Sequence, residues 1–207
     1  MIARGFLIRD HNHRLKLSAP AFACLSACAD PEKSIIIRHT IQKGSEEDYF
    51  FHAARRVRVI HTLPITAIHQ FIAVEDDLAW NKAILSVLKI ERVSKAKCEK
   101  AELDMSVLNK ARDFALNGKI KEAEDILKTQ IGEDPSSMLS KALSKPISNT
   151  TVAFVGNTKK EVDGFSIFQS KDSLWLLKPT DSSEDSKRIT IYPVESRDLV
   201  KEVQNWF

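Results

Sequence analysis

Glycine and proline are scarce in this chain, with 6 and 7 occurrences among 207 residues. The glycines never cluster, so the sequence has neither a P-loop nor a dinucleotide-binding turn, in which closely spaced glycines let the backbone approach phosphate. A GxSxG nucleophile turn is also absent. These absences argue against a classical nucleotide enzyme or serine hydrolase. We therefore predict a non-enzymatic protein with no catalytic residue and no cofactor.

Cysteine is rare as well, and its three copies, Cys24, Cys28 and Cys98, form an odd set with no disulfide framework. This pattern favours a reducing compartment, so we predict a cytoplasmic protein. No apolar run approaches the roughly 18 residues that are needed to span a bilayer. Residues 1–10 are too short and too charged for a secretion signal. We therefore predict no membrane insertion and no export by the general route.

Charge of one sign is not concentrated either. Lys and Arg number 31 against 28 Asp and Glu, which gives a formal net charge of +3. The densest basic run, at 55–58, alternates as a strand would and does not form a patch. We therefore predict no specific nucleic-acid binding. A hydrophobic fraction of 43% and a charged fraction of 29% are ordinary for a soluble globular protein that needs no stabilising metal or disulfide.

What the sequence does contain is one pattern that occurs twice. A short apolar helix signal, a proline and a β-branched run occur at 22–37 and again at 138–154. Each copy runs on through strands to a second proline, Pro64 in the first copy and Pro193 in the second. A repeat of this kind predicts architecture and favours binding over catalysis.

The repeat predicts an α+β fold with two pseudo-symmetric helix–antiparallel-sheet halves joined by a helical insert. We predict that 1–207 forms a single domain, in which repeat one covers about 19–75, the helical insert about 76–133 and repeat two about 136–207. Short connections between the strands of each repeat favour antiparallel pairing.

Apolar periodicity predicts the individual elements. Strands are predicted at 34–42, 49–53, 56–61, 150–157, 164–170, 173–178 and 188–192. Helices are predicted at 19–29, 76–91, 104–117, 119–131, 136–144 and 195–207. After Pro64, the spacing of Ile65, Ile68, Phe71 and Ile72 predicts one more helical stripe. A polar loop is predicted at 179–186.

Two histidines could suggest a metal site. On a strand, His11 and His13 would point to one face, as two ligands of a metal do. Alternatively they lie in a polar turn with both rings exposed. No motif supplies a third ligand, so we predict no metal site.

Two cysteines admit a structural interpretation through the repeat. Aligning the prolines of the two copies places Cys24 opposite Leu139 and Cys28 opposite Leu143, which predicts small core residues and no zinc site. The acidic runs at 45–48 and 75–77 lie at predicted turns or helix starts, where carboxylates favour the helix dipole.

Aromatic residues on the predicted strands are the candidate partner-binding residues. They are Phe50, Phe165, Phe168 and Trp175. The strand at 174–177 is apolar on both faces, so it is either covered by helices on both sides or exposed for a partner. If exposed, these aromatics would anchor the partner, because aromatic residues dominate binding hot spots.

The layout resembles the EspG-type secretion chaperones of actinobacterial type VII systems. In that family, two pseudo-equivalent α+β halves surround intervening helices, and each half looks like helix, proline, strand, hairpin, strand, short helix. That order would correspond here to 25–64 and 139–193, and the segments at 163–165, 174–177 and 189–200 also look like the end of that family's chains. The resemblance implies a shared fold and a protein-binding role, and it carries over no functional residue position by position.

Together these observations lead to one main hypothesis and two alternatives. The main hypothesis is a non-enzymatic chaperone or adaptor that binds another protein, with secreted proteins as the candidate substrates. One alternative is a homodimeric regulatory or structural protein, so the chain would be a monomer or a homodimer. The other is a metal-dependent hydrolase built on His11, His13 and scattered carboxylates.

Overall fold

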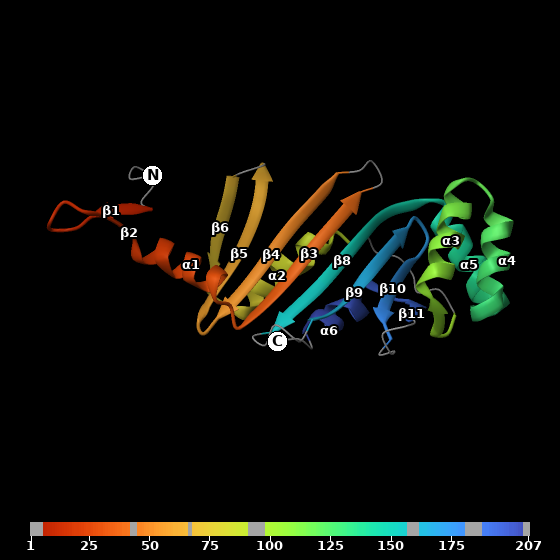
Figure 1. Ribbon diagram of the computed structural model, residues 1–207. Helices are drawn as coiled ribbons and strands as arrows, with labels where there is room; N and C mark the ends of the chain where they lie inside the picture. Colours follow the sequence, from red (N-terminus) through yellow and green to blue (C-terminus); the bar gives the residue numbers. More distant parts are fainter. Residues whose placement is uncertain are drawn as a thin grey trace. The chain divides into compact units, whose positions relative to one another are not determined.

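The computed structural model of the protein contains helices and two β-sheets (Figure 1). It describes residues 6–41, 45–65, 68–90, 98–156, 162–180 and 188–204. The predicted loop at 179–186 therefore lies mostly outside the described residues. Within them the fold is α+β, as the sequence predicts.

Nine strands form the large sheet, in the order β6-β5-β4-β3-β8-β9-β10-β11-β7. Its strands are β3 (Lys33–Ile41), β4 (Glu46–Ala54), β5 (Val57–Ile65), β6 (Ile68–Val74), β7 (Ala101–Asp104), β8 (Pro146–Gly156), β9 (Val162–Ser170), β10 (Leu174–Pro179) and β11 (Arg188–Pro193). A separate two-stranded sheet pairs β1 (Leu7–Arg9) with β2 (Leu15–Leu17). The pairs β4–β5, β5–β6, β9–β10, β10–β11 and β11–β7 are antiparallel.

Six helices complete the described elements. They are α1 (Ala19–Ala29), α2 (Asp77–Leu88), α3 (Met105–Leu116), α4 (Ile120–Ile131), α5 (Glu133–Ser144) and α6 (Ser196–Gln204). Local sequence explains where several begin and end. The Ser18 hydroxyl accepts a hydrogen bond from the Ala21 amide and caps α1, and Gly118 ends α3 at a φ of 78°, which glycine adopts without Cβ strain.

The chain divides into two compact units, which are described separately. The first unit comprises Met1–Ile36, Asp48–Val87 and Phe154–Val162. The second unit comprises Ile37–Glu47, Leu88–Ala153 and Asp163–Phe207. The prediction of a single domain stays a prediction.

In the first unit, α2 covers one face of β4 and β5. Phe51 and Trp80 are fully buried, and their rings meet edge to face with centroids 5.3 Å apart. An ion pair between Arg58 and Asp77 fastens the start of α2 to β5. Helix α1 packs against β5 and β6, and in Figure 1 it lies in front of the strands whereas α2 lies behind them.

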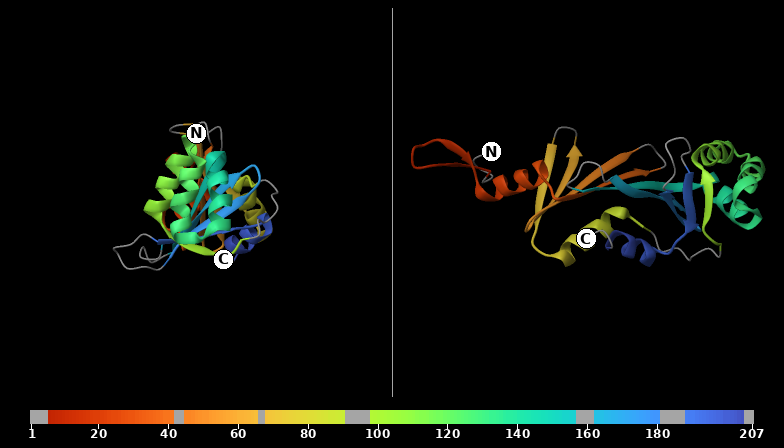
Figure 2. Two further views of the ribbon diagram at one scale, coloured as in Figure 1. Left: turned by 90° about the vertical axis from the view of Figure 1, so that its right-hand side faces the viewer. Right: turned by 60° about the horizontal axis from the view of Figure 1, so that its bottom comes forward.

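In the second unit, α3, α4 and α5 pack side by side (Figure 2). Alanines at their contacts, among them Ala111, Ala115 and Ala123, let the helix backbones approach closely. The helices share one hydrophobic cluster with β7, β9, β10 and β11, to which Trp175 contributes the largest side chain. Within the predicted insert at 76–133, α3 and α4 form a helix hairpin that packs on this sheet, whereas most of α2 belongs to the first unit.

Two features of this fold differ from the sequence analysis. The stripe at Ile65, Ile68, Phe71 and Ile72 is not a helix, because Ile65 ends β5 and the others lie in β6, which pairs with β5. A short apolar run fits both a helical and a strand period, and here pairing with a neighbouring strand decides. Strand β7, which directly precedes α3, was not predicted at all.

The same order of elements occurs twice along the chain. Helix α1, strands β3 to β6 and helix α2 correspond in order to α5, β8 to β11 and α6. Strands β3 and β8 are neighbours in the sheet. From β3, the strands β4 to β6 follow in order toward one edge, and from β8 the strands β9 to β11 follow toward the other. A geometric pseudo-symmetry between the halves stays a prediction.

Candidate protein-binding surface

Three of the four aromatic residues proposed as partner anchors lie inside the protein. Phe165, Phe168 and Trp175 are 4%, 8% and 1% exposed. Their exposure was the condition for an anchoring role, and it is not met. Trp175 also donates its indole N–H to the Ser173 hydroxyl at 3.0 Å, so its one polar group is satisfied in the core. Strand β10 is covered on both faces, one of the two alternatives that its sequence allows.

Phe50 is placed differently, in a row of rings on the first unit. It is half-buried on β4 and stacks on His61 of β5, with ring centroids 5.1 Å apart. His61 in turn stacks on Phe71 of β6 at 4.7 Å. The register places these three residues directly opposite one another across the strands. We call Phe50, His61 and Phe71, with the flanking His52 and His69, the ring row.

The histidines of the ring row are tied to one another. His61 Nε2 and His69 Nδ1 lie 2.8 Å apart, so one nitrogen donates a hydrogen bond and the other accepts it. Burial lowers the pKa of His52 and of His61, and each has a neighbouring histidine that lowers it further. Both effects favour the neutral imidazole at these two positions.

A second surface of the first unit is more strongly apolar. Helix α1 buries Ala21 and Ala27 but leaves Phe22 62% and Leu25 41% exposed. This is the reverse of the usual amphipathic helix, which turns its large apolar side chains inward. The hairpin β1–β2 before it exposes four more large apolar side chains. We call this set the N-terminal apolar surface: Phe6, Ile8, Leu15, Leu17, Phe22 and Leu25.

Exposed apolar residues also mark the end of β5 and strand β6. They are Leu63, Ile65, Ile68 and Ile72. Among the described residues, Leu116 of α3 is the one exposed large hydrophobic residue of this kind in the second unit. Apolar exposure is therefore concentrated on the first unit.

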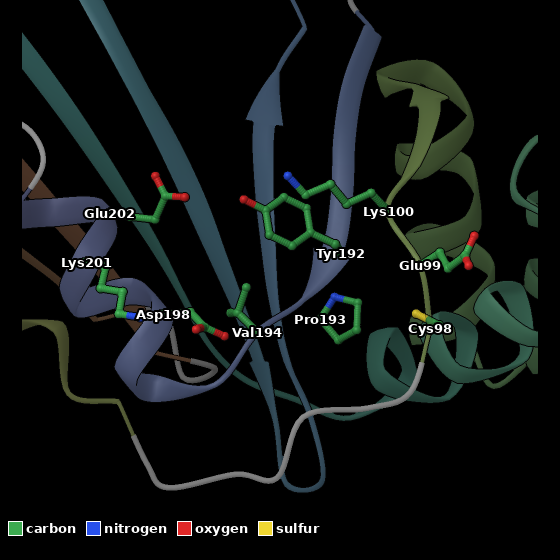
Figure 3. A pocket seen from close by; sticks show the side chains of 9 residues that line it. All are labelled: Cys98, Glu99, Lys100, Tyr192, Pro193, Val194, Asp198, Lys201 and Glu202. Carbon is green, nitrogen blue, oxygen red and sulfur yellow. The ribbon is translucent and has the colours of Figure 1, made fainter.

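The second unit has an open pocket of about 530 Å³, shown in Figure 3. Tyr192 lies at its centre, and Lys100 Nζ is 4.5 Å from the centre of the tyrosine ring. Burial and the nearby carboxylates of Glu202 and Asp198 raise the pKa of Tyr192 to about 12, so its hydroxyl stays protonated at neutral pH. Glu202 in turn pairs with Lys178. One carboxylate of the pocket is thus paired with a lysine from outside its lining.

The residues weighed for metal binding are not gathered into a site. His11 and His13 lie in the turn between β1 and β2, where the Asp10 carboxylate accepts hydrogen bonds from the amides of Asn12 and Arg14. Both histidines are exposed, so the polar-turn alternative is the one observed. Nowhere in the described ranges do three or more His, Cys, Asp or Glu side chains come together as metal ligands would.

The cysteines of α1 and the acidic runs make local contacts. Cys24 and Cys28 are half-buried on α1, and burial raises the pKa of Cys28 to about 11, which leaves an unreactive thiol. The Asp76 carboxylate accepts a hydrogen bond from the Ala79 amide at the start of α2, and Glu47 pairs with Lys89. Across the described helices, none has the length and apolar character needed to cross a membrane.

The N-terminal apolar surface was not predicted from the sequence, where the apolar spacing at 19–29 indicated only a helix. One signal could have pointed to it. Leu7–Arg9 and Leu15–Leu17 are too short to bury their apolar side chains between them, so exposed leucines and isoleucines were to be expected there.

No protein-family model matches the sequence, and no curated protein matches it. A search of solved structures does find a match. The type VII secretion system chaperone EspG5 of Mycobacterium tuberculosis, solved in complex with a PE25–PPE41 dimer, superposes with a TM-score of 0.68. The match covers 99% of this chain and 81% of EspG5, at 12% sequence identity. This chain has the EspG-type fold. The resemblance read from the sequence is thus confirmed at the level of the fold, and the EspG-type fold is what the ring row and the N-terminal apolar surface are built on.

Proposed function

We propose that this protein is a non-enzymatic chaperone or adaptor that binds another protein through its N-terminal apolar surface. The observation that carries the proposal is the inverted helix α1, with Phe22 and Leu25 exposed and alanines buried. Phe22 and Leu25 lie three residues apart on one face of α1, and exposed apolar patches on soluble proteins mark interaction sites.

The size of the effect supports the proposal. Burying a fully exposed large apolar side chain contributes about 1.5–3 kcal/mol. The six residues are 40–62% exposed, so a partner that covers them gains roughly half of that from each, which helps to offset the cost of association. The short β1–β2 hairpin buries few residues of its own. Its exposed apolar side chains therefore contribute little to the stability of the fold, which favours a role in binding.

The EspG-type fold supports the class of partner. EspG5 is a secretion chaperone that was solved with a PE25–PPE41 dimer bound. We propose by analogy that the partner here is a protein destined for secretion, held in the cytoplasm before export. Phe50 in the ring row is a further predicted contact, because its ring is half-buried beside other rings and is not part of a closed core.

The proposal is tested by changing α1 alone. In the double variant Phe22→Ser, Leu25→Ser we expect capture of the native partner from extracts of the source organism to fall at least about tenfold, since two anchors are removed. Leu116→Ser in the second unit is the control, because it removes an exposed apolar side chain from a helix outside the proposed surface. Partners are identified by mass spectrometry against the unmodified protein. Equal capture by the double variant and the control would contradict the proposal.

A further inference from the structure

The two edges of the nine-stranded sheet differ in how they are protected. Strand β7 is short, carries Glu102 and Asp104, and has α3 and α4 packed against it. Arg188 of the adjacent strand lies 3.7 Å from each of these two carboxylates. Charge, shortness and a covering helix are the usual devices that stop an edge strand from pairing with another chain.

Strand β6, the opposite edge, is longer and uncharged, although helix α1 packs against it. Its sequence, Ile68 to Val74, contains no charged residue, no proline and no glycine. Ile68 and Ile72 are 52% and 44% exposed on one face. Among the described elements β6 pairs with β5 alone, so the backbone groups along its outer side are available.

We propose that β6 pairs antiparallel with β6 of a second copy of this chain, about a two-fold axis at Gln70. This register follows from the sequence of the strand. It places Gln70 opposite Gln70 of the second copy, where two side-chain amides can hydrogen-bond to each other. It also places Ile68 opposite Ile72 of the second copy, so that the two exposed isoleucines of each strand cover those of the other.

The ring row provides an independent argument for the same register. Across β4, β5 and β6 the directly opposed residues alternate as Phe50, His61 and Phe71, with centroids 5.1 and 4.7 Å apart. In the proposed dimer the next residue opposite Phe71 is His69 of the second copy. The alternation of phenyl and imidazole rings therefore continues across the axis, with the same stacking as in the Phe50–His61 and His61–Phe71 pairs.

The occupant is a second copy because the strand is complementary to itself. Each opposed pair in this register is amide with amide, aliphatic with aliphatic, or phenyl with imidazole, and none joins like charges. Pairing of two strands buries less surface than the roughly 1,600 Å² of a standard interface. We therefore expect a weak dimer whose population rises with protein concentration. The surface is separate from Phe22 and Leu25 on α1, so the dimer does not depend on the proposed function.

Charge exchange at Gln70 tests the proposal. Light scattering on the purified full chain should show a mass that rises to twice that of the monomer with concentration. Gln70→Lys should weaken the dimer at least about tenfold, because two like charges meet on the axis. Mixing Gln70→Lys with Gln70→Glu should restore it. Asn109→Lys, at an exposed position of α3, should leave the mass unchanged.

Disulfide cross-linking tests the proposed register of the two β6 strands. In a background with Cys24, Cys28 and Cys98 changed to Ser, Gln70→Cys should form an interchain disulfide under mild oxidation, whereas Ala73→Cys, which lies away from the axis, should not. Thermal unfolding of each variant verifies the fold. A monomeric mass at every concentration, an undiminished dimer in Gln70→Lys, or equal cross-linking at both positions would overturn the proposal.

Discussion

At the scale of single residues, His39 shows how burial determines protonation. It lies in the second unit, 3% exposed, with Nδ1 2.7 Å from the Thr150 hydroxyl. Burial lowers its pKa from the ordinary value of 6.5, and nearby Lys89 lowers it further while Glu47 opposes the shift. The folded protein therefore holds this imidazole neutral, whereas the unfolded chain protonates it near its ordinary pKa.

The consequence is a predicted loss of stability in acid. A lowered folded-state pKa gives stability that is complete above about pH 6.5 and is lost as the pH falls toward the folded pKa. His52 and His61 are shifted in the same direction and add to the effect. We expect the free energy of unfolding, measured with urea between pH 7.5 and 5, to fall with pH, and His39→Gln to reduce that slope by up to about 1.4 kcal/mol per pH unit.

His11→Gln is the matched control for this measurement. His11 is exposed in the turn between β1 and β2, so its replacement should leave the slope as in the unmodified protein. A slope that is the same in His39→Gln as in the unmodified chain would show that His39 is not held neutral by the fold.

At the scale of elements, the hairpin β1–β2 is separable from the rest of the first unit. Within the described chain its strands pair with each other, and the Ser18 amide donates to the Phe6 carbonyl where the hairpin meets α1. The cap of α1 is supplied by Ser18 itself, which follows the hairpin. The hairpin thus contributes exposed apolar surface and little packing.

We therefore predict that removing residues 1–17 separates binding from folding. The free energy of unfolding should change by less than about 1 kcal/mol, because few buried groups are lost. Capture of the partner should fall strongly, since four of the six residues of the N-terminal apolar surface are removed. Urea unfolding and the capture assay measure the two effects. A large loss of stability together with unchanged capture would contradict this assignment.

The elements also show which parts of the sequence analysis succeed. Predicted helices at 104–117 and 119–131 match α3 and α4 closely, because their apolar spacing is regular and Gly118 and Gly132 end them. The prediction for β6 is wrong because Ile68, Phe71 and Ile72 fit a helical period. Only the pairing with β5 distinguishes a strand from a helix here. The matching of Pro64 with Pro193 is affected too, since β6 follows Pro64 whereas α6 follows Pro193.

At the scale of the whole molecule, the two compact units share continuous strands. The division between them falls within β3, β4 and β8, so no linker separates them along these segments. The arrangement argues for cooperative unfolding.

Two tryptophans test that cooperativity. Trp80 reports on the first unit and Trp175 on the second, and both are fully buried. We make two single-tryptophan variants, in each of which the other tryptophans are changed to Phe. In each variant we expect the midpoint of urea unfolding measured by fluorescence to equal the midpoint measured by circular dichroism. Midpoints that differ between fluorescence and circular dichroism in the same variant would contradict the prediction of a single domain.

The sequence by itself determined the α+β fold class of this protein. Scarce glycines exclude phosphate-binding turns, and regular apolar spacing with proline and glycine stops determines most helices and strands, because these signals are local. Only the tertiary structure decided which apolar side chains stay exposed. Burial depends on what packs against a residue, and an apolar Trp175 in the core looks the same in sequence as an apolar Phe22 at the surface. The proposed binding surface lies on α1 and the hairpin, whereas the predicted anchors Phe165, Phe168 and Trp175 are buried in the core.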